Sequence, residues 1–214
     1  MAGSICGIDL DEFKIEKFSR PEQVNHRQKL GIENDAFVVF YVGRPFIRKG
    51  FHILLQAWQI FSNLQDKTEK VLLLAGCDLK DVISVAGFCP KGIIPLGYIE
   101  NMEPYYAACD AVALPSFHEG MPYSLLEAAA ARRTMVASDI PGIDSVVRHN
   151  INGLLVEVQS AEKLAQAFEQ LCTEPELRNK LAENARQDIE NKFDRKNITK
   201  LLTNYYYSIG LKKR

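Results

Sequence analysis

The strongest constraint on the fold is a series of short apolar runs, most of which stop directly at a glycine or a proline. The runs do not alternate apolar with polar side chains, as expected of strands buried on both faces, and segments with helical periodicity separate them. This pattern predicts an α/β fold in three Rossmann-like layers, a parallel sheet flanked by helices. The runs are residues 36–42, 70–75, 92–96, 111–114 and 134–138.

The remainder of the chain is consistent with one domain. The sequence has 214 residues without an internal repeat or a low-complexity linker, and residues 161–211 are helical by period with a break at Pro175. We expect residues 5–214 to form a single domain. Residues 1–4, Met-Ala-Gly-Ser, are typical of an expression leader.

The composition excludes several classes of function. The 26 Lys and Arg residues nearly balance the 27 Asp and Glu residues, which leaves a net charge of -1 and no broad field for nucleic acid. The five cysteines form no Cys-x-x-Cys motif, so we expect reduced core residues. The four histidines lack metal-ligand spacing, which argues against a metal site. No apolar run reaches the roughly 18 residues of a membrane span.

Two glutamates, Glu119 and Glu127, bracket the point where a loop is expected to become a helix. Pro122 suits the first helical position, because its missing N–H costs nothing there. The free N–H groups of a first turn favour an anion, and carboxylate oxygens accept hydrogen bonds from sugar hydroxyls. Taken alone, a glutamate pair at this spacing is more often a helix-end charge and a solvated helix face.

A basic loop follows the first apolar run. The segment GRPFIRKG, residues 43–50, places Arg44 and Lys49 between a strand end and a helix start. Arginine can hold two phosphate oxygens and lysine acts as a point charge, so the pair suits a diphosphate leaving group. An exposed basic turn is the alternative, and we expect Arg48 to be a bystander. Since parallel strands end at one edge, this loop, residues 97–98 and residues 116–121 should converge.

The motifs occur in a fixed order that carries a family resemblance. They are Gly-Arg…Lys-Gly, Leu-Gly-Tyr, an Asp before an apolar run, Pro-Ser…Glu-Gly-Met-Pro…Leu-Glu-Ala, Asp-x-Pro-Gly and Asn-Gly-Leu-Leu-Val. In this order they resemble the retaining group 1 glycosyltransferases, family four of the GT-B fold. The match runs from about Gly7 to the C-terminus and covers the C-terminal, donor-binding half, so the N-terminal acceptor domain is expected to be absent.

The resemblance implies a role for each candidate residue. Arg44 and Lys49 would hold the diphosphate of a UDP- or GDP-sugar donor, and Glu119 would bind the transferred hexose near the reacting carbon. Glu127 would accept hydrogen bonds from the ribose hydroxyls. The backbone N–H groups of Gly120, Met121, Tyr123 and Ser124 would surround phosphate and sugar, and Gly97 and Tyr98 would face the base.

The resemblance implies no cofactor, because the cations and the helix N-terminus replace a divalent metal ion. Asp9-Leu10-Asp11 matches the metal-binding Asp-x-Asp pattern by chance, and we interpret it as an entry loop. The chain departs from the family where Arg132 and Thr134 replace a common Gly and Pro, so the preceding helix should lack its usual left-handed cap. Asp144 also replaces a common Glu, which puts a structural hydrogen bond there in doubt.

These observations predict the nucleotide-sugar-binding domain of a retaining hexosyltransferase. In the full protein it would act on a glycan or lipid-linked glycan acceptor, in polysaccharide biosynthesis, and alone it would bind donor with little or no turnover. We expect a cytoplasmic protein, compatible with peripheral association at the inner face of the membrane. Two alternatives remain open: a nucleotide-sugar epimerase of similar fold, and a non-catalytic nucleotide-binding or partner-binding module.

Overall fold

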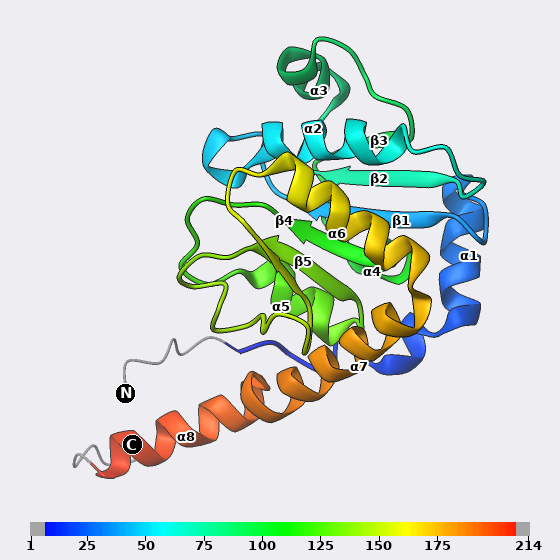
Figure 1. Ribbon diagram of the computed structural model, residues 1–214. Coiled ribbons are helices and arrows are strands. Elements are labelled where there is room, and N and C mark those ends of the chain that lie inside the picture. Colours follow the sequence, from blue (N-terminus) through cyan, green and yellow to red (C-terminus); the bar gives the residue numbers. More distant parts are fainter. Residues whose placement is uncertain (1–6, 209–214) are drawn as a thin grey trace.

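A six-stranded parallel sheet forms the centre of the molecule in the computed structural model, which describes residues 7–208 (Figure 1). The strand order is β3-β2-β1-β4-β5-β6, and every pairing is parallel. The predicted α/β class and its parallel sheet are therefore confirmed. The strands are β1 (Phe37–Val42), β2 (Lys70–Ala75), β3 (Ile93–Gly97), β4 (Ala111–Leu114), β5 (Thr134–Ser138) and β6 (Leu154–Val156).

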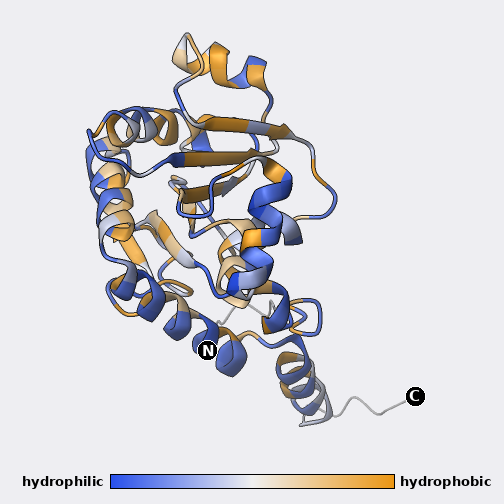
Figure 2. Ribbon diagram, turned by 90° about the vertical axis from the view of Figure 1, so that its right-hand side faces the viewer, coloured by the Kyte–Doolittle hydropathy of each residue, from blue (hydrophilic) through white to orange (hydrophobic). Residues whose placement is uncertain are grey.

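Each face of the sheet carries its own apolar core. In β1, Val38 and Phe40 point to one face and Val39 and Tyr41 to the other, because successive strand side chains alternate. Figure 2 shows the resulting layers, with apolar strands inside and polar outer faces on the helices. The first core contains α1 (Arg20–Leu30), α4 (Glu103–Ala108), α5 (Tyr123–Ala130) and α7 (Pro175–Lys192); the second contains α2 (Phe51–Ser62), α3 (Leu79–Ala86) and α6 (Ala161–Thr173).

The last helix, α8 (Arg195–Ser208), differs from the others because the structure gives it no buried residue. It extends away from the body in Figure 1. The helical C-terminal third is thus divided twice: before Pro175, as predicted, and again at residues 193–194. Within residues 7–208 there is no helix of the length and apolarity that crossing a membrane requires.

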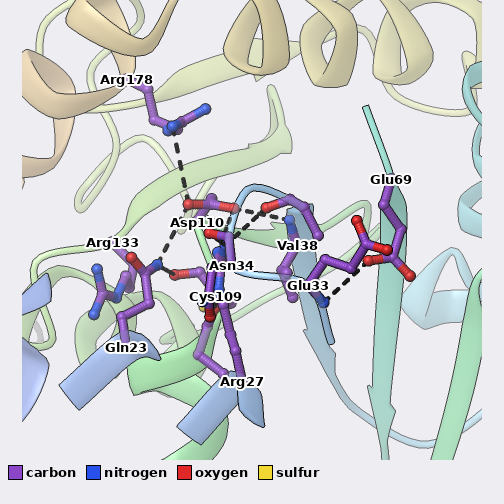
Figure 3. Close-up of polar contacts among 12 residues, drawn as sticks. Gln23, Arg27, Glu33, Asn34, Val38, Glu69, Cys109, Asp110, Arg133 and Arg178 are labelled. Atoms are coloured by element: carbon purple, nitrogen blue, oxygen red, sulfur yellow. Dashed lines mark hydrogen bonds and ion pairs between the residues drawn. The ribbon is translucent and has the colours of Figure 1, made fainter. Parts of the chain in front are cut away.

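A buried ion pair joins the sheet to α1 at the amino-terminal edge (Figure 3). Arg27, 1% exposed, places Nη2 2.7 Å from Oδ2 of Asp110, the residue directly before β4. The same carboxylate oxygen accepts the Val38 N–H at 2.8 Å. Arg27 donates its remaining bonds to the backbone oxygens of Ala108, Asn34 and Ala36, at 2.9, 2.9 and 2.8 Å.

The C-terminal end of α5 corrects the expectation of a missing left-handed cap. Arg132 itself adopts the left-handed conformation, with φ 56. Its N–H donates to Ala129 O at 3.0 Å and the next N–H, of Arg133, to Ala128 O at 2.8 Å, which together form a Schellman motif. The side chain at this position is arginine, yet the turn keeps the geometry that usually selects glycine.

Two smaller expectations also change, and one strand was not predicted. Pro122 precedes α5 and does not occupy its first turn, because the helix begins at Tyr123. Cys77 and Cys109 are buried, but Cys89 is exposed and does not belong to the core. Cys6 and the proposed leader, residues 1–4, lie outside the described residues, and β6 is too short to give a strand pattern in sequence.

Candidate functional site

The candidate residues gather at the carboxyl-terminal edge of the sheet. The strand order reverses between β1 and β4, and such a switch point is where open α/β sheets bind ligands. The loop after β1 carries Arg44 and Lys49, and the loop after β4 carries Glu119. The predicted convergence of these two loops at one edge is therefore present.

The two loops meet directly through an ion pair. Nζ of Lys49 lies 2.7 Å from Oε1 of Glu119. The Lys49 side chain is 22% exposed and that of Glu119 9%. A pair at this edge retains access to solvent, and Lys49 still has N–H donors for another acceptor.

Close backbone packing fixes the relative position of the loops. A Cβ on Gly50, which has φ +67, would lie 1.9 Å from the carbonyl oxygen of Pro115. The Phe117 N–H donates to Arg48 O at 2.8 Å. On the other side, a Cβ on Gly142 would lie 2.3 Å from Glu119 O. Glycine at both positions allows this approach, so Glu119 is held between the 43–50 loop and the Asp-x-Pro-Gly turn.

Arg44 lies in the same loop as Lys49 but its side chain is exposed. Its guanidinium forms no ion pair or hydrogen bond with the residues that the structure describes. Its backbone oxygen accepts the Tyr41 hydroxyl at 3.0 Å, which anchors the start of the loop. Arg48, expected to be a bystander, is exposed and its guanidinium carbon lies 5.9 Å from the centre of the Phe46 ring.

Glu127 is positioned by a buried tyrosine that the sequence did not indicate. The hydroxyl of Tyr106, in α4, donates to Oε2 of Glu127 at 2.6 Å. Tyr106 is itself fixed by the ring of Phe40 in β1, at a centroid distance of 5.2 Å. Burial raises the pKa of Glu127 above its ordinary value and the Glu12 charge acts in the same direction, while the Tyr106 hydrogen bond opposes them. One carboxylate oxygen is thus held and the other is left for a second donor.

The first turn of α5 offers backbone donors beside Glu119. The Tyr123 N–H is used locally, since it donates to Met121 O at 3.0 Å. The N–H groups of Gly120, Met121 and Ser124 have no acceptor within residues 7–208. Three of the four predicted amides are therefore available to an anion, with the partial positive charge of the helix N-terminus behind them.

Gly97 ends β3, which lies two strands away from β1, and Tyr98 follows directly after it. The Gly97 N–H donates to Cys77 O at 2.8 Å and its oxygen accepts the Gly76 N–H at 2.7 Å, so the β3 end is tied to the β2 end. Gly97 has φ +66, and Tyr98 is 86% exposed. An exposed aromatic ring at this edge is suited to stacking on a planar ligand.

The Asp-x-Asp sequence near the start takes no part in this site. Asp9 and Asp11 face the beginning of α8, where Arg195 Nη1 lies 3.2 Å from Asp9 and Lys196 Nζ lies 2.7 Å from Asp11. No group of three or more His, Cys, Asp or Glu side chains among the described residues is arranged to hold a metal ion. The Asp144 carboxylate accepts the Gly142 N–H at 3.0 Å, so a hydrogen bond is made in that turn.

The sequence motifs include two further residues of this edge, Ser116 and Gly142, but predicted no individual role for either. Ser116 is fully buried and its Oγ has no partner among the described residues. Gly142 sets the approach to Glu119, but a Pro-Gly pair in sequence indicates only a turn. Tyr106 gave no signal either, because a tyrosine in a helix is usually a packing residue.

Comparison with known proteins gives this arrangement a context. A family model described as glycosyl transferases group 1 matches residues 22–188. The D-inositol 3-phosphate glycosyltransferase of Corynebacterium urealyticum is 31% identical over 214 residues, which cover 95% of this chain and 50% of that protein. The chain spans about half the length of the curated relatives that it matches.

Solved structures show the same fold. Anabaena HepE in complex with UDP aligns with a TM-score of 0.82 at 25% identity, over 94% of this chain and 56% of HepE. The C-terminal domain of the group 1 glycosyl transferase LpcC of Francisella tularensis aligns with a TM-score of 0.73 at 22% identity. That alignment covers 88% of this chain and 99% of the LpcC domain, so the predicted correspondence to the C-terminal half of a GT-B fold is confirmed.

Proposed function

The chain belongs to the group 1 glycosyl transferases, and from this membership we propose that its carboxyl-terminal edge binds a nucleotide-sugar donor for retaining hexosyl transfer. The observation that carries the proposal is the contact of Lys49 with Glu119 at 2.7 Å. It brings a cation suited to phosphate and a carboxylate suited to sugar hydroxyls to one point of the edge. A diphosphate and the sugar attached to it need these two groups side by side.

The proposed roles follow from the state of each group. Lys49 and the unpaired Arg44 would bind the diphosphate and stabilise the negative charge that develops when the bond from the sugar carbon to the leaving oxygen breaks. The free N–H groups at the start of α5 would bind the same anion. Glu119 would orient the hexose without forming a covalent bond, and the acceptor hydroxyl would attack from the face that the diphosphate leaves.

Glu127 and Tyr98 would bind the nucleoside. The free oxygen of Glu127 would accept a ribose hydroxyl, and Tyr106 would act as a positioning residue by holding the other oxygen. Tyr98 and the Gly97 backbone would face the base. HepE was crystallised with UDP-glucose and with UDP, which supports a uridine donor as the first ligand to test.

The acceptor would be bound by the part of the longer protein that corresponds to the other half of the relatives. One relative is the capsular polysaccharide biosynthesis glycosyltransferase CapM of Staphylococcus aureus, which supports a glycan-building role. We propose that this chain alone binds donor but transfers little sugar. An acceptor-dependent product at a turnover typical of whole enzymes, about 10 s⁻¹, would contradict this part.

Calorimetric titration without metal tests the donor site. UDP, GDP and ADP are titrated into the 214-residue chain and into Lys49→Ala and Glu127→Ala. We expect one nucleotide to bind best and each substitution to weaken it about tenfold or more, the loss of one charge-assisted hydrogen bond. Lys29→Ala is the matched control, because Lys29 is exposed on α1. Equal affinity in Lys49→Ala and Lys29→Ala would overturn the proposed diphosphate site.

Two further experiments on the same chain distinguish the proposed function from its two alternatives. An epimerase would convert the sugar of the bound donor without any acceptor, which chromatography of the donor after incubation would detect. In a non-catalytic module, Glu119→Gln would leave nucleotide-sugar affinity unchanged. We expect no acceptor-free conversion, and we expect Glu119→Gln to bind UDP as the parent does but the complete nucleotide sugar more weakly.

A further inference from the structure

A second charged cavity lies at the amino-terminal edge of the sheet, opposite to the candidate donor site. It has a volume of about 500 Å³, within the range of small-molecule pockets. Its wall combines the start of α1, the turn after α5 and the second turn of α7, which meet around Asp110. Figure 3 shows Arg178 on one side of Asp110 and Gln23 and Arg133 on the other.

The cavity carries an excess of positive charge. Arg20, Arg132, Arg133 and Arg178 line it, and the only carboxylate in its lining is Asp110. That carboxylate is already paired with the buried Arg27 at 2.7 Å, whereas Nη2 of Arg178 is 3.9 Å from it. Arg132 is also paired with Glu183, which lies outside the lining. Even with these two carboxylates, the arginines around the cavity outnumber the negative charges beside them.

Several donors of the cavity are unused. Arg133 donates from Nε and Nη2 to the backbone oxygens of Tyr106, Phe18 and Ala107, at 2.7, 2.9 and 3.0 Å. Its Nη1 has no acceptor within residues 7–208. Burial lowers the pKa of Arg133, Cys109 and Asp110 oppose this effect, and the positive charges of Arg27 and Arg132 add to it.

The N-terminus of α1 adds a second kind of anion donor. Ser19, the N-cap of this 11-residue helix, makes no side-chain capping bond. The N–H groups of Arg20 and Glu22 have no acceptor in the described part of the chain. Ser19 and Arg20 both line the cavity, so the positive end of the helix dipole faces the same space as the guanidinium groups.

Arg132, which lines this cavity, has a strained backbone conformation. Its φ of 56 is the left-handed region that glycine adopts without strain. Arg132 and its neighbours Arg133 and Thr134 all line the cavity. A strained residue that contributes a charge to a pocket indicates a role beyond the turn itself.

We propose that this arginine pocket binds the phosphate group of a small phosphorylated metabolite. Guanidinium groups and helix N-termini both favour a doubly charged oxyanion. The cavity is larger than one phosphate group, so it has room for the body of the metabolite. The site is separate from the donor edge because it lies at the opposite end of the parallel strands.

Inorganic phosphate is the first probe. Its binding is monitored by NMR of the backbone amides at constant ionic strength. We expect saturable shifts at residues 19–23 and 132–134. In the double variant R20Q/R132G the phosphate Kd should rise about tenfold or more, because two charged donors are lost. The control is R44A/K49A, which removes the cations of the donor edge and should leave these shifts and this Kd unchanged. Nucleotide affinity should show the reverse pattern.

Three outcomes would overturn the proposal. The first is the absence of saturable shifts at residues 19–23 and 132–134, and the second is an equal response to chloride. The third concerns the source of the phosphate. We expect glycerol 3-phosphate to bind, and we expect no protein to be recovered with phosphatidic acid vesicles in a flotation assay. If the protein instead binds the vesicles but not glycerol 3-phosphate, and R20Q/R132G abolishes the vesicle binding, the pocket binds a lipid headgroup.

Discussion

The two edges of the sheet use charged residues in opposite ways. At the amino-terminal edge, Arg27 is 1% exposed and four hydrogen bonds to protein oxygens occupy it. At the carboxyl-terminal edge, Lys49 is 22% exposed, and Glu119 is the one partner of its amino group among the described residues. Arg44 has no ion pair with any residue from 7 to 208. The protein itself satisfies the hydrogen-bonding groups of the Arg27–Asp110 pair, whereas the Lys49–Glu119 pair keeps unused ones.

Structural and functional charges therefore differ in how completely the protein itself satisfies them. A buried charge is tolerated only when its partners are present in the fold, so the Arg27–Asp110 pair specifies how α1 docks on β1 and β4. A pair such as Lys49–Glu119, with side chains 22% and 9% exposed and with spare donors, can bind a ligand without rearranging the fold. The predictions below test this contrast, beginning with the largest effect.

Removing the buried carboxylate should cause the largest loss of stability. Asp110→Ala removes the carboxylate that neutralises the buried Arg27 and accepts the Val38 N–H. We expect the free energy of unfolding to fall by about 3–5 kcal/mol, measured by urea denaturation. The control Glu103→Ala removes a partly exposed ion pair with Lys17 at 2.5 Å and should cost at most about 1 kcal/mol. Similar losses in both variants would remove the distinction between the edges.

The next effect concerns the packing of the ligand loops. Gly50→Ala would place a Cβ 1.9 Å from Pro115 O, so the 43–50 loop must move. Gly31→Ala is a close control, because Gly31 has φ +69 and no atom within 4 Å of the added Cβ. We expect about 1 kcal/mol for the control, from backbone strain alone, and about 2–4 kcal/mol for Gly50→Ala, from strain plus overpacking.

Nucleotide binding completes this comparison. Gly31→Ala should bind nucleotide as the parent chain does, whereas Gly50→Ala should bind more weakly because Lys49 shifts away from Glu119. Equal stability losses at Gly50 and Gly31 would mean that the loop adjusts freely. Its position would then not depend on the contact with Pro115.

The fold was predictable from the sequence because parallel strands buried on both faces leave uninterrupted apolar runs. Five of the six strands lie within one residue of the runs expected from sequence. The strand β6 has three residues, and its Asn-Gly-Leu-Leu-Val context resembles any buried turn followed by an extended segment. Alternation and length, the two signals of a strand, both fail at this size.

The candidate site was predictable only where a residue's chemistry is local to its motif. Lys49 and Glu119 stand in separate loops, and their convergence followed from the rule that parallel strands share one carboxyl edge. The bond from Tyr106 to Glu127 joins α4 to α5, and no spacing in the sequence encodes it. The left-handed turn at Arg132 was not predicted because arginine rarely adopts a positive φ, but the two hydrogen bonds of the Schellman motif hold it there.

That turn gives the third prediction. Arg132→Gly removes the strain of φ 56 and also the surface ion pair with Glu183, so stability should rise by up to about 1 kcal/mol. Arg132→Ala loses the same ion pair but keeps a Cβ. Thermal unfolding should therefore place the Gly variant about 1 kcal/mol above the Ala variant. If the Ala variant equals the Gly variant, the turn carries no strain, and the residue was chosen for its charge without a backbone penalty.

The smallest effect should appear at Glu127, where stability and binding are expected to change in opposite directions. Its folded pKa is raised above 4.5 by burial, so the stability it contributes is complete below pH 4.5 and is lost as pH rises through the folded pKa. Glu127→Gln cannot ionise, can still accept the Tyr106 hydroxyl, and should thus be more stable than the parent at pH 7 but not at pH 4. Urea denaturation at both pH values measures this, with the exposed Glu169→Gln as a control that should show no such dependence.

Nucleotide affinity at pH 7 should nevertheless fall in Glu127→Gln, because an amide presents a single acceptor oxygen and Tyr106 occupies it. A variant that loses both stability and affinity at pH 7 would instead make Glu127 a structural residue, like Asp110 at the opposite edge.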